Sequence, residues 1–375
     1  MKKFMKKSSE AKKLRVAQVA PLWYKVPPNG YGGTELIVSQ LTEEMVRRGH
    51  KVTLFASGDS KTKAKLVSVS KRNLFESSVP WMHDSYNIVN LIEAFSRARD
   101  FDIIHTHIDL YDQLFRARCA TPSIATLHNP FWPMPDDPKK NKRWTAYHSR
   151  VLLYNRFPRL PYAGISDSYR RQCPADINFV KTIHHGIDDR RLKFNRRGGE
   201  HFVWFGRISQ AKGLDIAIKI AREMKIDLLI AGKIVNPEAK IFFEKKVRPY
   251  LGKKIKFAGE LKSEKDKSEF LGEAKAFLYP LQWEEPFGLA MIEAMACGTP
   301  VIAFRRGSVP EIVEHGKTGF VVSDSVEALA DAVGKIDRID RKATRQWVEN
   351  NFSNEHMTDG YEKLYFELCR KTQSK

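Results

Sequence analysis

The sequence has few cysteines, fewer acidic than basic residues, and no long apolar run. Its four cysteines stand singly in 375 residues. Without a CxxC pair, a zinc ribbon and a disulfide framework are excluded, and we expect a reducing, cytoplasmic environment. No apolar run approaches the ~20 residues of a membrane-spanning helix, and no apolar segment of signal-peptide type follows the basic start.

The shortage of acidic residues leaves a strongly basic chain. Lys and Arg total 64 against 44 Asp and Glu, a net charge of +20. Residues 1–13 contain six lysines and one glutamate, which predicts a disordered basic tail. Such charge attracts phosphates on nucleotides, nucleic acid or anionic lipid. A merely solvated tail and peripheral contact with the inner face of an anionic membrane both remain open.

What the sequence does contain is a regular alternation of short apolar strands and amphipathic helices. A chain of 375 residues favours two domains at ~150 residues each. We predict strands at 14–20, 51–56, 103–106, 123–127 and 162–165, and again at 201–205, 227–231, 255–257, 276–279 and 300–303. Helices between them include 34–48, 213–224 and 264–274, the last with Ser263 as N-cap. The pattern predicts an α/β protein with two facing, Rossmann-like, doubly wound parallel sheets.

The domain boundaries follow from composition. Residues 188–200 are rich in Arg and Gly and poor in apolar residues, which is typical of a linker. We therefore expect a first domain over 14–190, a second over 200–350, and a C-terminal helix over 353–373 that has the first domain as a candidate packing surface. In such folds ligands bind at the carboxyl ends of the strands, so two facing sheets predict a cleft between the domains.

Two turns between a strand and a helix are candidates for binding phosphate. The first, PPNGYGGTE at 27–35, is rich in glycine, which allows close backbone approach to a ligand. It matches neither GxGxxG nor GxxxxGK[ST], and a plain tight turn explains it equally well. The second contains Arg207 and Lys212, two cations that could clamp a diphosphate. The alternative is two solvated bases on a basic protein.

The strongest candidate segment is WEEPFGLAMIEAMACGTP at 283–300. It predicts a loop with Glu285, then a mostly apolar helix with Glu293. A carboxylate among apolar neighbours usually has a hydrogen-bonding partner, such as ribose hydroxyls. An ordinary salt bridge at a helix edge is the alternative for Glu293.

With GRISQAKG upstream and GSVPEIVEHGKTGFVV downstream, this segment resembles the family-4 retaining glycosyltransferases (glycosyl transferases group 1). GYGGTE, GHKVTLFA, FDIIHTH, TLHNP, GISDS and HHGID occur in the family's order, so the resemblance covers nearly the whole chain from Leu14. It implies the GT-B architecture, two facing Rossmann-like domains. It also implies an enzyme that transfers a sugar from a nucleotide-sugar bound mainly by the second domain.

The resemblance implies a role for each matching residue. Arg207 and Lys212 would hold the donor diphosphate and stabilise the departing nucleotide. Glu293 would bind ribose hydroxyls, Glu285 hydroxyls of the transferred sugar, and His128 the sugar near the reacting centre. His128, Arg207, Lys212 and Glu285 form the implied catalytic group. The other implied donor-binding positions are Gly32, Gly33, Gly232, Lys233, Glu260, Leu261, Phe287, Gly288 and Leu289.

We expect neither a metal nor a cofactor. Asp100-Phe101-Asp102 precedes a predicted strand and is interpreted as strand-edge carboxylates rather than a metal site. His105 and His107 lie on one side of a strand, but no third ligand is evident, so packing or acceptor contact is favoured over metal binding. His185 stands where the family usually has Asn, which leaves open any role of that Asn.

Substrates follow least clearly from the residues. A UDP-hexose is the favoured donor and GDP-mannose the next, and the resemblance implies retention of configuration. The acceptor, a small molecule, a glycan or a lipid-linked sugar, is expected at the first domain, where 132–135 and 144–160 mix aromatics with Arg. A buried amphipathic helix also explains the second of these segments. Alternatives are a nucleotide-sugar epimerase or hydrolase on the same scaffold, or a non-enzymatic binder of anionic surfaces or nucleic acid; we expect no nucleic-acid partner, because no nucleic-acid-binding motif is evident.

Overall fold

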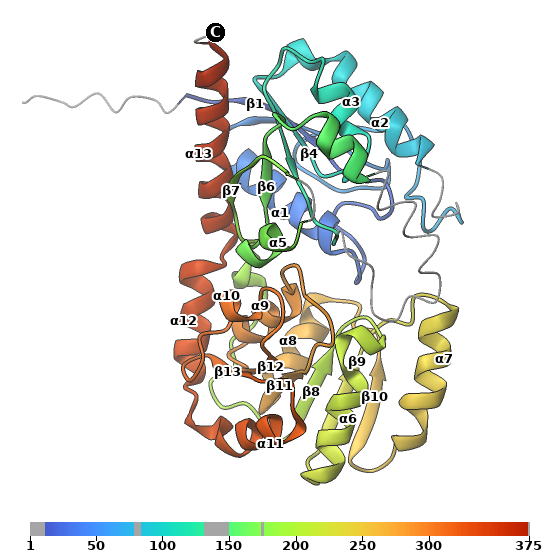
Figure 1. Ribbon diagram of the computed structural model, residues 1–375, viewed down its shortest axis with the longest axis vertical. Helices are drawn as coiled ribbons and strands as arrows, with labels where there is room; N and C mark the ends of the chain where they lie inside the picture. The colour runs from blue at the N-terminus through green and yellow to red at the C-terminus, as the bar shows by residue number, and fades with distance from the viewer. Residues whose placement is uncertain (1–11, 79–83, 131–149, 174–175, 374–375) are drawn as a thin grey trace, which may run out of the picture.

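Two parallel sheets organise the chain in the computed structural model, which describes residues 12–78, 84–130, 150–173 and 176–373. Within these ranges the first sheet has the strand order β3-β2-β1-β4-β5-β6-β7 and the second β10-β9-β8-β11-β12-β13. The two sheets belong to two domains stacked along the long axis of the molecule (Figure 1). The expected fold class, two Rossmann-like α/β domains, is confirmed.

The first domain has its central strand β1 between β2 and β4, with Val16 opposite both Val52 and Ile103. Its strands are β1 Arg15–Val19, β2 Lys51–Phe55, β3 Lys65–Val67, β4 Ile103–Thr106, β5 Ser123–Thr126, β6 Tyr162–Gly164 and β7 Phe179–Thr182. Its helices are α1 Gly33–Arg47, α2 Ser85–Ser96, α3 Asp112–Arg116 and α5 Asp167–Gln172. Residues 150–156 are also helical.

The second domain repeats this arrangement. Its strands are β8 Phe202–Phe205, β9 Leu228–Ala231, β10 Ile255–Gly259, β11 Ala276–Tyr279, β12 Val301–Phe304 and β13 Gly319–Val322. Its helices are α6 Leu214–Glu223, α7 Pro237–Lys246, α8 Glu264–Gly272, α9 Leu289–Ala296, α10 Val309–Ile312, α11 Val326–Lys335 and α12 Arg341–Asn351. Short 3-10 turns lie at Ala98–Asp100, Asp189–Arg191, Gln210–Lys212, Arg248–Tyr250 and Ile336–Arg338.

All ten strands expected from the sequence are present, with ends shifted by up to two residues. Three further strands, β3, β7 and β13, were not predicted. Each lies at an edge of its sheet and is partly exposed, so each has only a short apolar run for a pattern to detect. The predicted N-cap of α8 is confirmed. The Ser263 side chain accepts from the Asp266 N–H, and Asp266 completes a capping box.

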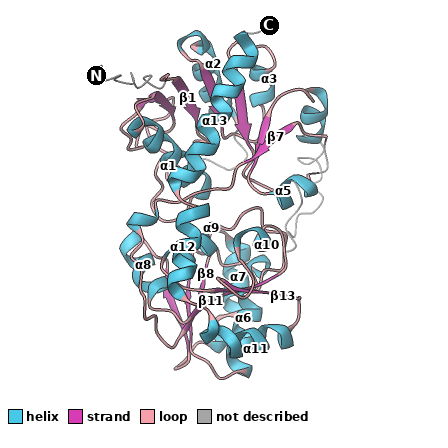
Figure 2. Ribbon diagram, turned by 90° about the vertical axis from the view of Figure 1, so that its left-hand side faces the viewer, coloured by secondary structure: helices cyan, strands magenta, loops and turns pink. Residues whose placement is uncertain are grey.

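The C-terminal helix α13 Asn354–Gln373 leaves the second domain and lies along the first (Figure 2). Tyr361, Leu364 and Tyr365 are buried with Ile37 and Leu41 of α1. The helix α13 directly follows α12, which packs against α9, so the segment from α12 to α13 contacts the cores of both domains. No helix within the described ranges is both long and apolar enough to cross a membrane.

Candidate functional site

A cleft of about 930 Å³ lies between the two domains, at the carboxyl ends of their strands. His128 follows β5, Arg207 follows β8, and Glu260 follows β10. All of the residues implied by the resemblance line this cleft: Gly32, Gly33, His128, Arg207, Lys212, Gly232, Lys233, Glu260, Leu261, Glu285, Phe287, Gly288, Leu289 and Glu293. Parallel strands place these loops at one edge of each sheet, and the domains bring the two edges together.

Lys212 and Glu285 form a largely buried ion pair at the end of β11. Lys212 Nζ donates to Glu285 Oε2, which also accepts from Trp283 Nε1 at 3.0 Å. The ammonium group lies 4.8 Å from the centre of the Trp283 ring. Burial lowers the pKa of Lys212, and the Glu285 carboxylate opposes this only in part. An additional anion in the cleft would therefore be bound favourably by Lys212.

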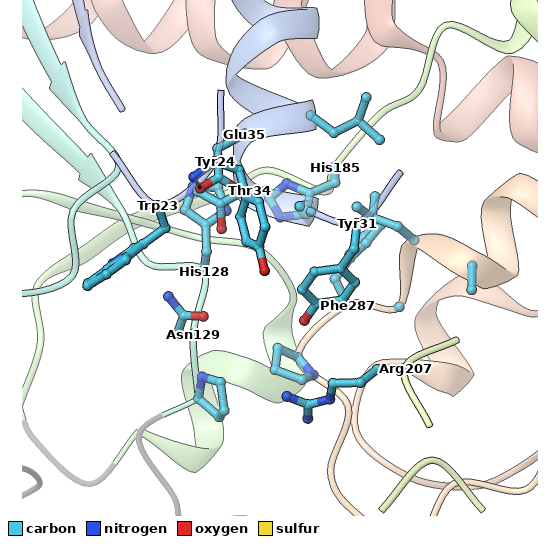
Figure 3. A pocket seen from close by; sticks show the side chains of 18 of the residues that line it. Trp23, Tyr24, Tyr31, Thr34, Glu35, His128, Asn129, His185, Arg207 and Phe287 are labelled. Carbon is cyan, nitrogen blue, oxygen red and sulfur yellow. Dashed lines mark hydrogen bonds between the residues drawn. The ribbon is translucent and has the colours of Figure 1, made fainter. Parts of the chain in front are cut away.

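Arg207 is the cation that is still available to a ligand. Its half-buried side chain has no ion pair with any residue in the described part of the chain. Figure 3 shows the guanidinium directed into the cleft, opposite Tyr31 and Phe287. A guanidinium in this position can donate two parallel hydrogen bonds to a phosphate.

Glu293 of α9 points toward α8, where Lys267 Nζ donates to its Oε1 at 2.7 Å. Burial lowers the pKa of Lys267, but the Glu293 carboxylate more than offsets this, so its pKa is raised. Glu293 therefore forms a salt bridge, which was one of the two interpretations offered by the sequence, and it also lines the cleft. Lys267 also lines the cleft and was missed from the sequence, where the only signal was that Glu293 required a partner.

The loop before α9 turns sharply at the cleft. Gly288 has φ +87°, and a Cβ there would lie 2.5 Å from Met291 Cε, so this position requires glycine. Ser308 Oγ supports the loop by donating to the Phe287 carbonyl at 2.6 Å. In the first turn of α9 the Met291 N–H donates to the Gly288 carbonyl at 3.0 Å. The preceding N–H groups, those of Leu289 and Ala290, begin at the cleft and suit an anion.

The glycine-rich loop of the first domain reaches across to the second. A Cβ on Gly33 would lie 3.4 Å from Leu289 Cδ1, and one on Gly30 would lie 3.0 Å from Glu260 Oε1. Glu260 in turn pairs with Lys233 at 3.4 Å. The segment 27–35 thus lines the cleft through residues 30–35 and approaches the second domain there. Glu35 in the same loop was given no role from the sequence, yet it lines the cleft, and burial raises its pKa to about 7.

His128 lies on the first-domain wall and is buried against other histidines. Its Nε2 is 3.0 Å from His107 Nδ1, and its ring stacks on His185 at 5.1 Å. Phe287 also contacts His185, edge to face, with ring centres 4.9 Å apart. Burial lowers the pKa of His128 to about 3, so this imidazole is neutral at physiological pH.

The remaining sequence candidates have structural partners. His105 hydrogen-bonds Tyr365 and Thr126, in line with the packing interpretation. Asp102 pairs with Arg15 at 2.9 Å on the neighbouring strand. Within the ranges that the structure describes, no group of three or more His, Cys, Asp or Glu is arranged to hold a metal.

The acceptor and tail expectations fall partly outside the described residues. This applies to residues 1–11, 132–135 and 144–149. Of the acceptor segment, Arg150 lines the cleft and pairs with Asp109 at 3.4 Å. Asp109, which the sequence reasoning missed, also receives the backbone N–H of His128 at 3.2 Å.

Two family models match the chain in adjoining segments. Residues 31–191 match the model described as Glycosyltransferase Family 4, and residues 188–353 match the model described as Glycosyl transferases group 1. Together they contain every candidate residue of the cleft.

Among characterised relatives, the N-acetyl-alpha-D-glucosaminyl L-malate synthase of Bacillus anthracis is 23% identical over 90% of this chain and 95% of its own length. The D-inositol 3-phosphate glycosyltransferase of Rhodococcus jostii is 26% identical over 89% of this chain and 84% of its own length.

Solved structures support the same fold. Sucrose-phosphate synthase from Thermosynechococcus elongatus has a TM-score of 0.77 and 22% identity, over 95% of this chain and 99% of its own. The Anabaena protein HepE, solved in complex with UDP-glucose, has a TM-score of 0.70 and 17% identity, over 94% of this chain and 100% of its own.

Proposed function

The chain belongs to the group 1, family 4 glycosyltransferases with the GT-B fold, and we propose that it transfers a hexose from a nucleoside diphosphate sugar with retention of configuration. The favoured donor is a UDP-hexose, with GDP-mannose second. The proposed reaction uses neither a bound metal nor a cofactor.

The observation that carries this proposal is the convergence of Arg207, Lys212 and the start of α9 on one cleft. Charge on the diphosphate increases as the bond to the sugar breaks, so groups that stabilise that charge lower the barrier. Arg207 offers a guanidinium without an ion pair in the described ranges, Lys212 a buried ammonium, and α9 its first-turn N–H groups. These three supply the work that a divalent cation would otherwise do.

The carboxylates suit the two ends of such a donor. Glu293 lies one helix turn inside α9, where its carboxylate would accept from ribose hydroxyls while it keeps its ion pair with Lys267. Glu285 lies in the loop before α9 and is held there by Lys212 and Trp283. In this position its carboxylate would accept hydrogen bonds from hydroxyls of the transferred sugar. Hydrogen bonds that involve a charged group are stronger than neutral ones, at about 1.5–3 kcal/mol each.

Retention is assigned to attack on the face from which the nucleotide leaves. The bond between the anomeric carbon and the diphosphate oxygen breaks as the acceptor oxygen forms its bond on the same side. The acceptor proton passes to the departing phosphate oxygen. This route needs no basic side chain beside the anomeric carbon, and it agrees with the neutral, weakly basic His128 on that wall.

The names of the relatives support transfer to an acceptor over the alternative of an epimerase or hydrolase. Both characterised relatives carry names of synthases or transferases that act on small anionic molecules, and HepE was solved with UDP-glucose. For this protein we propose an acceptor that is a small molecule, a glycan or a lipid-linked sugar and that binds beside Arg150. Peripheral contact of the basic chain with the inner face of an anionic membrane is a separate proposal that rests on its charge.

The first experiment is a thermal-shift screen with UDP, GDP and ADP and with their hexose conjugates. A ligand that binds only the folded state raises Tm by mass action, so a specific rise with UDP and UDP-glucose is expected. Mass spectrometry of the products then separates transfer from hydrolysis and epimerisation. A free, altered sugar in the presence of excess acceptor sugars would contradict the transferase assignment, and a response to none of these nucleotides would contradict the donor class.

A further inference from the structure

A series of hydrogen bonds leads from the C-terminal helix to His128, which lines the cleft. The Gln18 amide Nε2 donates to Tyr365 OH at 3.0 Å, and Gln18 Oε1 lies 2.8 Å from His107 Nε2. His107 Nδ1 lies 3.0 Å from His128 Nε2. All four side chains are buried. The second ring nitrogen of His128, Nδ1, is also buried and has no hydrogen-bond partner in the described part of the protein.

The proton positions follow from the first link. An amide oxygen can only accept, so His107 must carry its proton on Nε2. A neutral imidazole has a single N–H, so His107 Nδ1 is an acceptor and His128 donates from Nε2. His128 Nδ1 is then left with a lone pair and no proton. Both rings are neutral, because burial lowers the pKa of His107 and of His128.

The hydrogen bonds that Tyr365 makes to His105, and His105 to Thr126, are consistent with these proton positions. Tyr365 OH accepts from Gln18, so its own proton is free to go to His105 Nδ1, 2.6 Å away. His105 then donates from Nε2 to Thr126 Oγ1 at 2.7 Å. A buried acceptor without a partner is also tolerated better than a buried N–H without one. The direction of the whole network is thus set by the orientation of one amide, that of Gln18.

The ring of His128 lines the cleft near the loop that we propose to hold the transferred sugar. His185 stacks on His128 at 5.1 Å and contacts Phe287 at 4.9 Å. Phe287 follows Glu285 by two residues, in the loop that leads through Gly288 into α9. The wall that contains His128 therefore faces the loop that would hold the sugar.

We propose that Gln18, acting through His107, holds His128 in the tautomer with a lone pair on Nδ1, and thereby selects a transferred sugar with a hydroxyl at this point over one with a carboxylate. A hydroxyl donates to the lone pair, whereas a carboxylate would place two acceptors against each other. Gln18 and His107 are positioning residues in this scheme. The inference rests on the proposed function and deepens it by naming the class of sugar.

The first test measures the tautomer without any substrate. Two-bond ¹H–¹⁵N spectra of histidine-labelled protein distinguish a protonated from an unprotonated ring nitrogen. The expected result is a protonated Nε2 and an unprotonated Nδ1 on His128, with loss of this single state in Gln18→Met. Gln40→Met removes a buried glutamine outside the cleft and is the matched control, expected to leave the signal unchanged. A proton on His128 Nδ1 in the wild type overturns the proposal.

The second test measures binding by titration calorimetry without acceptor. UDP, UDP-glucose and UDP-glucuronate are compared, or GDP, GDP-mannose and GDP-mannuronate if GDP is the better ligand. Wild type is expected to bind the hexose conjugate at least ~100-fold more tightly than the uronate, since a site built for a hydroxyl leaves groups unpaired with the wrong ligand. Gln18→Met should reduce that ratio about tenfold or more and leave the nucleotide Kd unchanged.

Equal affinity of wild type for the two conjugates, or an unchanged ratio in Gln18→Met, overturns the selection. Failure to bind any of the nucleotides contradicts the proposed function instead, and the spectra of the free protein still report on the tautomer.

Discussion

Replacing Glu293 with methionine removes a proposed ribose ligand and, at the same time, the partner of a buried cation. Lys267 Nζ lies 2.7 Å from Glu293 Oε1, and the two side chains are only 13% and 7% exposed. Loss of one member leaves an uncompensated charge, which typically destabilises by about 3–5 kcal/mol. At ~2–4 °C per kcal/mol for a domain of this size, Glu293→Met should lower Tm by about 6–20 °C.

The double variant Lys267→Met with Glu293→Met separates stability from binding. Replacing a buried pair by apolar side chains of similar volume is often neutral or stabilising, so Tm should return to near the wild-type value. Nucleotide binding should not return. Loss of hydrogen bonds to a charged group, about 1.5–3 kcal/mol, weakens Kd for UDP by roughly 10- to 150-fold in both variants.

The pH dependence gives an independent check on the ion pair. In Glu293→Met, burial still lowers the pKa of Lys267, and only the weaker attractions of Glu264 and Cys297 oppose it. We therefore expect the pKa of Lys267 in the folded variant to lie below its unfolded value of about 10.4. The unfolded state then binds more protons, and the stability of the variant rises with pH toward that value. Its deficit relative to wild type should therefore shrink as pH rises toward the unfolded value.

Urea unfolding measures the stability of each variant, and titration calorimetry measures its Kd for UDP. Glu223→Met is the control, because it removes the partner of exposed Lys219 and should change stability by less than ~1 kcal/mol. If the double variant binds UDP as tightly as wild type, Glu293 is only structural. If Glu293→Met keeps its Tm, the ion pair contributes nothing and the reasoning from burial is refuted.

Three further predictions address the leaving group, the metal and the domain interface. Arg207→Ala should lower kcat by about 10²-fold or more with Tm unchanged, since the lost group acts on charge that develops in the transition state; a salt-sensitive rise in KM alone, equal to that of Lys219→Ala, would contradict this. Activity should persist in excess EDTA, and complete loss that Mg²⁺ or Mn²⁺ restores would refute the metal-free mechanism. At the interface between the domains, Glu311 accepts from the N–H groups of Asp167 and Ser168 at 2.8 and 2.6 Å and pairs with His184. Burial raises the pKa of Glu311, but these interactions lower it more, so its pKa in the folded state is below the usual value. Its stabilisation is present above the unfolded pKa of about 4.5 and is lost as pH falls through the lower folded value, so the Tm advantage of wild type over Glu311→Gln should shrink from pH 5 to 3 in calorimetric scans.

Local sequence determined much of the fold because its signals act over a few residues. The strand β8 is a run of apolar residues, and β1 and β4 are mostly apolar or β-branched. Ser263 with Asp266 marks the start of α8 through contacts three residues apart. The topology placed Arg207 and His128 each at the ligand-binding edge of its own sheet, because loops that follow parallel strands share an edge, and the packing of the two domains brought these edges together at one cleft. The chemical roles of these residues came from their resemblance to a family, since two bases in a loop do not by themselves identify a diphosphate site.

Only the tertiary structure decided which polar groups are partners. Lys267 and Glu293 are 26 positions apart, and Gln18 and His107 are 89 apart, so no periodic pattern links them. The same holds for Tyr365. The sequence offered the first domain as a packing surface for the C-terminal helix but did not show that the Tyr365 hydroxyl meets Gln18 there. A sequence records donors, acceptors and charges, whereas their energies depend on distance and on exclusion of water. Both are set only when the two domains and the C-terminal helix have packed together.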